Sequence, residues 1–452
     1  MVHTFEALGV KLAVDVNSGA VHVLDDLTYR LLPLVEPPMA EHCPPELLAR
    51  LPEYRTEAVE EGWQDLRELA GNGLLFVEDD YVDPAAATAL QQSAPIKALC
   101  LHVSHDCNLR CQYCFASTGD FGTGRKIMDI ETAKRAIDFV IQRSGSRRNI
   151  EVDFFGGEPL MAMDTVKATV AYARSIEKKA GKCFRFTITT NGVLLDDENI
   201  DYINREMSNA VLSLDGRPQV NDRMRKTVNG KGSYEVIVPK FQKLVAGRGT
   251  KDYYLRGTFT HYNLDFAEDV MHMADLGFRN VSVEPVVGEE TCGYALKDED
   301  LPVVLEQYEK LAEKLKDRAD VNFFHFNVDL AQGPCVIKRL RGCGAGCEYV
   351  AVTPEGDIYP CHQFVGNPAY KIGSLSDGSF DMELSHRFSC LNIYTREECR
   401  DCWARFYCSG GCSASNLLVN GDIKKPNHVG CEMERKRLEC AIALKALAAG
   451  MG

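Results

Sequence analysis

The chain has 452 residues, a formal net charge of −14 and 18 cysteines. It has no long basic run and no apolar stretch long enough to span a bilayer, which excludes a nucleic-acid partner and a membrane role from the expectations. The N-terminus lacks a basic region followed by an apolar core, so the sequence predicts a cytoplasmic protein. Because cytosolic thiols stay reduced, cysteines gathered in two stretches favour metal or cluster ligation over disulfides.

Residues 1–83 are predicted to form a small N-terminal module. The segments 11–17 and 20–25 alternate apolar and polar residues around Ser18-Gly19, which predicts a β-hairpin. Helical spacing of apolar residues predicts helices after it, and 74–79 is predicted to be a short closing strand. This order describes a winged-helix-like domain, but its second helix is acidic, so DNA reading is not expected.

The module resembles the PqqD-like recognition domain of ribosomal peptide maturation systems. The resemblance implies that a leader peptide adds a strand to the exposed edge of the module's sheet. A purely structural lid is the alternative. Residues 84–95 are small and flanked by proline, which is typical of a linker.

Residues 96–330 alternate strand and helix patterns. The predicted strands are 97–103, 150–155, 184–189, 210–215, 253–260 and 280–286. Six such units predict an α/β domain with a parallel sheet, a partial (β/α)6 barrel that falls short of a closed eight-stranded one. Since chemistry in such sheets lies at the carboxyl ends of the strands, the loops that follow the strands are expected to form one site.

The loop after the first strand carries Cys107, Cys111 and Cys114 in the spacing C-x3-C-x2-C. One short loop of this kind can give thiolates to three irons of a cubane iron–sulfur cluster, which leaves the fourth iron open. A zinc knuckle or buried cysteines are the alternative, although zinc loops usually supply paired C-x2-C hooks. The sequence Gly156-Gly157-Glu158-Pro159 follows the second strand, and its two glycines allow a close backbone approach to a ligand.

Together these loops resemble those of the radical S-adenosylmethionine (SAM) enzymes. The resemblance implies that the open iron binds the amino and carboxylate groups of SAM, whose reduction gives a 5′-deoxyadenosyl radical. In this interpretation Glu158 meets the methionine ammonium, and Tyr113 or Phe115 lies near the adenine.

Three further residues are candidate SAM contacts. Asn191 and Ser213, after the third and fourth strands, are candidates for the ribose or the carboxylate. Arg225 could pair with the carboxylate through its planar guanidinium, or instead make a surface or helix-capping salt bridge.

Residues 331–452 hold a second group of cysteines, a predicted hairpin at 350–361 and a closing helix at 432–447. The pattern resembles the SPASM extension of radical SAM peptide maturases, although a zinc ribbon is possible on C-x2-C alone. The resemblance implies two auxiliary [4Fe–4S] clusters, the first on Cys343, Cys361 and Cys412 and the second on Cys399, Cys402, Cys408 and Cys431. Cys347 is the fourth ligand of the first cluster, or else it or Cys343 is free and leaves an iron open to a substrate thiolate.

This domain order resembles peptide-modifying radical SAM/SPASM enzymes, and the N-terminal sequence is most like the maturases of six-cysteine (SCIFF) peptides. The resemblance implies SAM, three [4Fe–4S] clusters, a cysteine-rich precursor peptide with a leader, and a one-electron donor of the flavodoxin or ferredoxin type. The implied reaction joins a peptide cysteine sulfur to a carbon of an acceptor residue as an intramolecular thioether, as in sactipeptides and ranthipeptides.

Three alternatives remain open. Formylglycine formation on a sulfatase and carbon–carbon crosslinking both need a base near the substrate, for which Asp215 and Glu284 are the possible carboxylates. The third alternative, from a different class, is a zinc-rich binding scaffold without activity.

Overall fold

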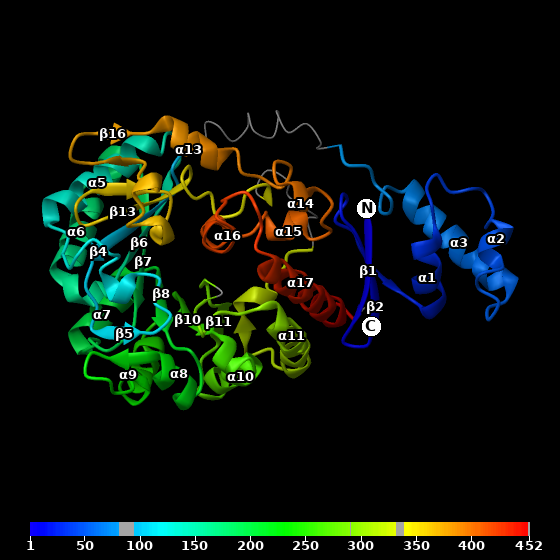
Figure 1. Ribbon diagram of the computed structural model, residues 1–452, viewed down its shortest axis with the longest axis horizontal. Helices are drawn as coiled ribbons and strands as arrows, with labels where there is room; N and C mark the ends of the chain where they lie inside the picture. Colours follow the sequence, from blue (N-terminus) through cyan, green and yellow to red (C-terminus); the bar gives the residue numbers. More distant parts are fainter. Residues whose placement is uncertain (81–94, 290, 331–338, 451–452) are drawn as a thin grey trace.

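The computed structural model describes residues 1–80, 95–289, 291–330 and 339–450 (Figure 1). The N-terminal module is an antiparallel sheet of β1 (Val2–Ala7), β2 (Val10–Asp15) and β3 (Val21–Leu24), with β2 in the centre. The predicted hairpin is therefore confirmed, and β1 extends it. The helices of the module are α1 (Asp26–Leu31), α2 (Pro45–Leu48) and α3 (Thr56–Gly71), and they lie on the outer side of this sheet (Figure 1). Of the predicted linker 84–95, only Pro95 falls within the described residues.

The predicted strand at 74–79 is wrong. The backbone there bonds to side chains instead of to a strand, because Val77 N–H donates to Asp15 Oδ2 (3.2 Å) and Asn17 Nδ2 donates to the Val77 carbonyl (2.7 Å). Phe76, at φ +57°, also leaves the extended conformation that a strand requires.

The central sheet contains all six predicted strands. These are β4 (Ala98–Ser104), β6 (Asn149–Gly156), β7 (Cys183–Thr190), β8 (Asn209–Ser213), β10 (Asp252–Phe259) and β11 (Asn280–Pro285). They lie in this order as parallel neighbours, and the short β12 (Asn322–Phe323) continues them beyond β11. Each is rich in β-branched and aromatic residues that contribute to a common core. Along β6, β7 and β10 the buried side chains alternate with partly or fully exposed ones, as expected for strands with one fully covered face.

Helices cover the outer side of this curved sheet (Figure 1). They are α5 (Ile130–Arg143), α6 (Met163–Ala180), α7 (Asp197–Glu206), α8 (Pro218–Met224), α9 (Tyr234–Ala246), α10 (Phe266–Asp275) and α11 (Leu301–Leu315). The connections therefore follow the βαβ pattern, which brings the carboxyl ends of the strands to one edge.

The predicted hairpin at 350–361 is present as β13 (Tyr349–Val352) and β14 (Asp357–Tyr359). The structure adds that β13 pairs in parallel with β4, so the central sheet runs on through β13, β14, β15 (Gly373–Ser374) and β16 (Ser379–Phe380). The expected boundary near residue 331 is therefore crossed by a continuous sheet, and Cys361 follows β14 within two residues of its end.

The C-terminal part is helical and joins the other two parts. It contains α13 (Met382–Ser389), α14 (Glu397–Arg400), α15 (Arg405–Cys408), α16 (Ser413–Asn420) and α17 (His428–Ala448). The predicted closing helix is confirmed as α17, which lies between α11 and β1 (Figure 1). None of the described helices is long and apolar enough to cross a membrane.

The N-terminal sheet packs directly on this C-terminal part. Val10, Leu12 and Val14 of β2 share a core with Trp403 and Ile442, whereas Ala13 faces the module's own helices. A strand that is buried on both faces is expected at the centre of a layered structure. The module is therefore an integral layer of the molecule.

Candidate active site

The cysteine loop is held at the carboxyl edge of the sheet by a small ribbon. Its β5 (Leu109–Cys111) pairs antiparallel with β9 (Arg225–Thr227), which places Arg225 opposite Cys111. A cavity lies here, and most of the residues proposed from the sequence line it. They are Cys107, Cys111, Tyr113, Cys114, Phe115, Gly156, Gly157, Asn191, Ser213 and Arg225.

The three cysteines form one group of thiols in a poorly solvated wall. Burial raises the pKa of Cys107 to about 11 and that of Cys111 to about 12, and the nearby Arg225 lowers both only in part. Leu109 N–H (3.4 Å) and Asn191 Nδ2 (3.6 Å) are directed at the Cys107 sulfur. Because buried thiols of this kind ionise when a metal centre binds them, the donor set fits a thiolate-ligated cluster.

The spacing of the side chains also separates a cluster from a single metal ion. Within the described ranges, no three His, Cys, Asp or Glu side chains converge closely enough to hold one ion. A structural zinc ion would require such convergence, since its ligands lie about 2.0–2.3 Å from the metal. Two donors, Arg225 Nε in the wall and Asn108 Nδ2 next to Cys107, are buried without a partner in the described part of the chain, which fits a site built for a polar ligand.

The glycines of the second loop serve the packing of that loop. A Cβ atom at Gly156 would lie 2.1 Å from the Ser104 carbonyl oxygen, and one at Gly157 would lie 2.2 Å from that of Asp106. Gly157 N–H and Glu158 N–H donate to these same two carbonyls (both 2.8 Å). The prediction that these glycines allow the backbone to approach a ligand is therefore incomplete. Their first effect is to let this loop pack against the residues that precede the cysteine loop.

The structure does not support the direct contact proposed for Glu158. Its carboxylate is fully buried and is absent from the cavity wall. It accepts hydrogen bonds from Leu160 N–H (3.0 Å), Thr190 Oγ1 (2.7 Å) and Asn191 N–H (2.8 Å). Burial raises its pKa, and these three bonds oppose that shift. Glu158 therefore positions the loop that carries Asn191, and its meeting with the ammonium group of SAM stays a prediction.

Tyr113, Asp215 and Arg225 form a buried triad beside the cysteines. The Tyr113 hydroxyl lies 2.9 and 2.7 Å from the two oxygens of Asp215, and Arg225 Nη1 donates to the Tyr113 oxygen (3.0 Å). Arg225 Nη1 also lies 3.9 Å from Asp215 Oδ1, and Arg225 is only 8% exposed. The surface salt bridge considered for Arg225 is thus excluded, and its partner is internal. The ring of Phe115, in contrast, is 47% exposed at the rim of the cavity.

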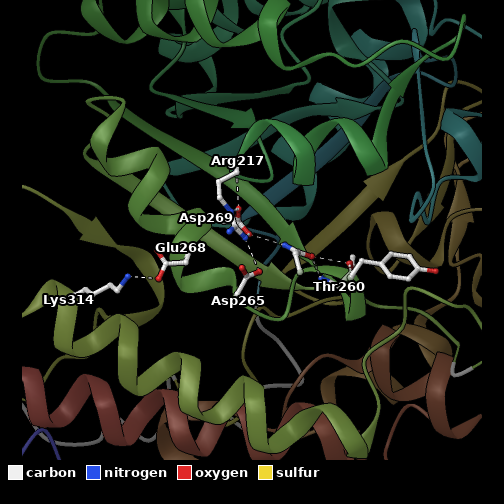
Figure 2. Close-up of polar contacts among 8 residues, drawn as sticks. Arg217, Thr260, Asp265, Glu268, Asp269 and Lys314 are labelled. Atoms are coloured by element: carbon white, nitrogen blue, oxygen red, sulfur yellow. Dashed lines mark hydrogen bonds and ion pairs between the residues drawn. The ribbon is translucent and has the colours of Figure 1, made fainter.

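A second polar network connects the loop after β8 to α10 and holds that loop in place (Figure 2). Asp269 on α10 accepts from the Arg217 backbone N–H (3.0 Å) and from Arg217 Nε (2.7 Å), while Arg217 Nη2 reaches Asp265 (2.8 Å). Gly216 is required here, because a Cβ atom would lie 2.3 Å from that of Asp269. This network positions Asp215, which directly precedes Gly216 in the chain.

The downstream cysteines form two groups. Cys361 lies close enough to Cys412 and Cys343 that each raises its pKa, after the larger effect of burial. Burial also raises the pKa of Cys399 to about 12, with further contributions from Cys431 and Cys402. Cys408 interacts in the same way with Cys431 and Cys399. These proximities follow the two groups proposed from the sequence, whose role as cluster ligands stays a prediction. The Cys347 sulfur lies against its own loop, 3.3 Å from the Gly344 carbonyl oxygen, and near Cys343.

Two protein-family models match this chain, one over the segment with the first cysteine loop and one over part of the downstream cysteine segment. A model of the Radical SAM superfamily matches residues 101–246, and a model of the SPASM iron–sulfur cluster-binding domain matches residues 343–403. The chain has the radical SAM fold, followed by a SPASM domain. A cysteine-type anaerobic sulfatase-maturating enzyme of Clostridium perfringens is 24% identical over 345 residues, which are 70% of this chain and 89% of that protein.

Two solved structures show the same arrangement. The structure of anSMEcpe with bound AdoMet and Kp18Cys peptide has a TM-score of 0.66 at 19% identity, and the match covers 79% of this chain and 100% of that one. Streptococcus suis SuiB bound to precursor peptide SuiA has a TM-score of 0.52 at 17% identity, and covers 95% of this chain and 98% of its own. At these identities the likeness shows the fold.

The SPASM domain contributes directly to the wall of the radical SAM cavity. His362 and Gln363, which follow Cys361, line it. The His362 ring packs against Phe155 (centroids 4.9 Å apart), and its Nδ1 lies 3.0 Å from the Tyr349 hydroxyl. Burial lowers the pKa of His362 to about 4. Sequence reasoning missed this residue, although its place beside a cluster cysteine was the available signal.

Glu284 of β11 and Arg256 of β10 also line the cavity. Glu284 Oε1 lies 3.2 Å from His325 Nε2 and 3.9 Å from Arg256 Nε. Burial alone raises the pKa of Glu284, but His325, Arg256 and Arg437 together hold it well below its ordinary value. Of the two carboxylates considered as bases, Glu284 is therefore a very weak one, and Asp215 is committed to Tyr113 and to Thr258 N–H (3.1 Å).

Proposed function

We propose that this protein is a radical SAM/SPASM enzyme that installs intramolecular thioether crosslinks in a ribosomally made, cysteine-rich peptide. The observation that carries the proposal is the composition of one cavity wall. It contains the three cysteines of the first loop and also His362, the direct neighbour of the auxiliary ligand Cys361. This wall supports the proposal, in which a radical generator and an auxiliary cluster would border the same space.

The residues of the wall fit SAM and a first cluster on Cys107, Cys111 and Cys114. When bound, this pair supplies a 5′-deoxyadenosyl radical. Arg225 is held on one side by Tyr113 and Asp215, and its buried, unpartnered Nε is suited to the carboxylate of SAM. Asn191 and Ser213 add polar contacts to the same wall, and Phe115 and Tyr113 offer ring faces to the adenine.

The two downstream groups of cysteines are proposed to hold two auxiliary [4Fe–4S] clusters, which makes three clusters in all. In the thioether reaction the acceptor C–H bond breaks and its hydrogen atom passes to the radical. The peptide thiol loses its proton and the C–S bond forms; an auxiliary cluster held by the downstream cysteines would accept the one surplus electron. An open iron beside Cys343 or Cys347 would bind the thiolate. An external one-electron donor of the flavodoxin or ferredoxin type restores the first cluster.

Formylglycine formation is the alternative. The similarity of this chain to a sulfatase-maturating enzyme supports it. That oxidation requires a base near the substrate to take the proton of its thiol or hydroxyl. The groups in the wall are poorly suited, because the pKa of Glu284 is well below its ordinary value and that of His362 is about 4. A thiol that bound to an open iron would release its proton to solvent on binding and would need no base at the moment of C–S bond formation, and this difference favours the thioether reaction.

A peptide substrate is supported by the N-terminal module. In the described part of the chain, β3 is paired with β2 on one side only, so its other edge can accept an added strand. An apolar groove runs beside this edge, and it is lined by Val21, Val23, Val328, Leu330 and Ala446. We propose that the leader of the precursor docks along β3. SuiB, whose matched structure contains the precursor peptide SuiA, covers 95% of this chain.

Co-expression with a six-cysteine precursor peptide tests the proposal. Mass spectrometry should show the loss of two hydrogens per link, with the linked cysteines protected from alkylation. The Cys107→Ala variant should leave the peptide unmodified and make no 5′-deoxyadenosine. Conversion of a cysteine to formylglycine in the same peptide would favour the alternative, and a peptide without any mass change would contradict both reactions.

A further inference from the structure

Arg396 is a buried cation between the two auxiliary groups of cysteines. It precedes α14, three residues before Cys399, and is only 4% exposed. Its Nη2 donates to Ser413 Oγ (2.9 Å) and toward the Ile423 carbonyl oxygen (3.4 Å). Its Nε is buried, and no acceptor for it lies within the described residues.

The guanidinium lacks an acidic partner among the residues that the structure describes. Its hydrogen bonds there go to a hydroxyl and to a carbonyl, both neutral. Arginine keeps its charge in proteins, and an unpaired buried charge is strongly unfavourable. A negative group that is not a carboxylate is therefore expected beside it.

The contacts of Arg396 adjoin cysteines of both sets, since Ser413 follows Cys412 and Gly410 lies two residues after Cys408. Burial lowers the pKa of Arg396, and Cys399, Cys408, Cys412 and Cys343 oppose that effect. Two of these four belong to each proposed cluster. The fold also makes room for the guanidinium, because Gly410, at φ +88°, would place a Cβ atom 2.8 Å from Arg396 Nη1.

We propose that Arg396 is the shared counter-ion of the two auxiliary clusters. A cubane cluster with thiolate ligands is anionic, and its negative charge grows on reduction. One fixed positive charge between two such clusters balances both, so it stabilises their reduced forms and raises their reduction potentials. This inference rests on the proposed auxiliary clusters but does not depend on which peptide is modified.

Arg396→Met, Arg396→Lys and Arg387→Met test this role in full-length, anaerobically reconstituted protein. Methionine removes the charge and keeps much of the length, whereas lysine keeps the charge. Arg387, an exposed residue of α13, is the matched control for the loss of one positive charge. The measurements are iron and sulfide per chain and redox titrations followed by electron paramagnetic resonance. The first cluster is recognised by its response to added SAM.

Arg396→Met should shift the auxiliary potentials downward, or lose auxiliary iron while the SAM-responsive signal remains. Arg396→Lys should restore most of either change, and Arg387→Met should match the parent. Unchanged auxiliary potentials at full iron content would overturn the proposal. An equal loss of auxiliary iron, or an equal fall in auxiliary potential, in the methionine and lysine variants would also overturn it. That result would show that the site requires the shape of arginine and not its charge. A parent that holds only about four irons would instead contradict the proposed auxiliary clusters themselves.

Discussion

Asp215→Asn should weaken the support of the cysteine loop. Asparagine keeps the size of the side chain and an acceptor for the Tyr113 hydroxyl, but it leaves Arg225 buried without its negative partner. The two charges lie 3.9 Å apart. At the effective dielectric constant of about 20 that suits protein sites, the lost attraction is about 4 kcal/mol. Breaking one side of a buried pair typically costs about 3–5 kcal/mol, which agrees with this value.

Asp265→Asn is the matched control for this change. Asp265 pairs with Arg217 at 2.8 Å, but its side chain is 52% exposed (Figure 2). Exposed pairs contribute only about 0.2–1 kcal/mol, so this variant should behave like the parent. Thermal unfolding and hydrogen exchange of residues 107–115 would be measured on anaerobically reconstituted protein. The Asp215 variant should melt several degrees lower and exchange faster in that loop. Equal melting and exchange in the two variants would refute the reasoning.

Three other changes test the framework of the site. Gly157→Ala would place a methyl group 2.2 Å from the Asp106 carbonyl oxygen, so the iron content should fall, while Gly71→Ala, with open space around it, should match the parent. Burial raises the pKa of Asp153 to about 6. The carboxyl group of Asp153 therefore stays protonated to a higher pH in the native state than in the unfolded chain. The protonated carboxyl thus loses its stabilising effect as pH rises through about 6. At pH 8 the free energy of unfolding of Asp153→Asn should be about 3 kcal/mol higher than that of the parent, whereas in acid the two should be equal. A difference that stays constant across pH would contradict this. Deletion of residues 1–80 should give aggregated protein, because it exposes the apolar surface around Trp403, and a soluble, well-folded product would contradict that expectation.

The strands of the central sheet could be predicted because their signal is local. Each of the six segments carries its own run of β-branched and aromatic residues, and helical patterns separate them. The site followed from one topological rule, since loops that leave parallel strands meet at a common edge. Cys107 lies more than 80 residues before Asn191 and Ser213. The rule nevertheless allowed all three to be assigned to one cavity before any contact was known.

What could not be predicted depends on partners that are distant in the sequence. Tyr113 and Asp215 are 102 positions apart, and neither has a local feature that indicates their hydrogen bond. The carboxylate of Glu158 is suited to bind an ammonium group. Hydrogen bonds from Thr190 and Asn191, at the end of β7, set the orientation of this side chain. The strand at 74–79 has a suitable composition, yet Asp15 and Asn17 occupy its backbone groups. In each case a tertiary hydrogen bond decided between locally equivalent choices.

The three parts of the chain are joined in a way that restricts how a peptide can reach the cavity. The β13–β4 pairing ties the SPASM domain to the radical SAM sheet, and the shared core around Leu12 and Trp403 ties the N-terminal sheet to the SPASM domain. Arg405 strengthens the second junction with hydrogen bonds to Asn17 (2.6 Å) and Asp79 (2.7 Å). Because both junctions are buried, the distance from β3 to the cavity is set by the fold. A leader docked on β3 would therefore present to the cavity those peptide residues that follow it at a defined spacing, so spacing as well as sequence should select the acceptor carbon.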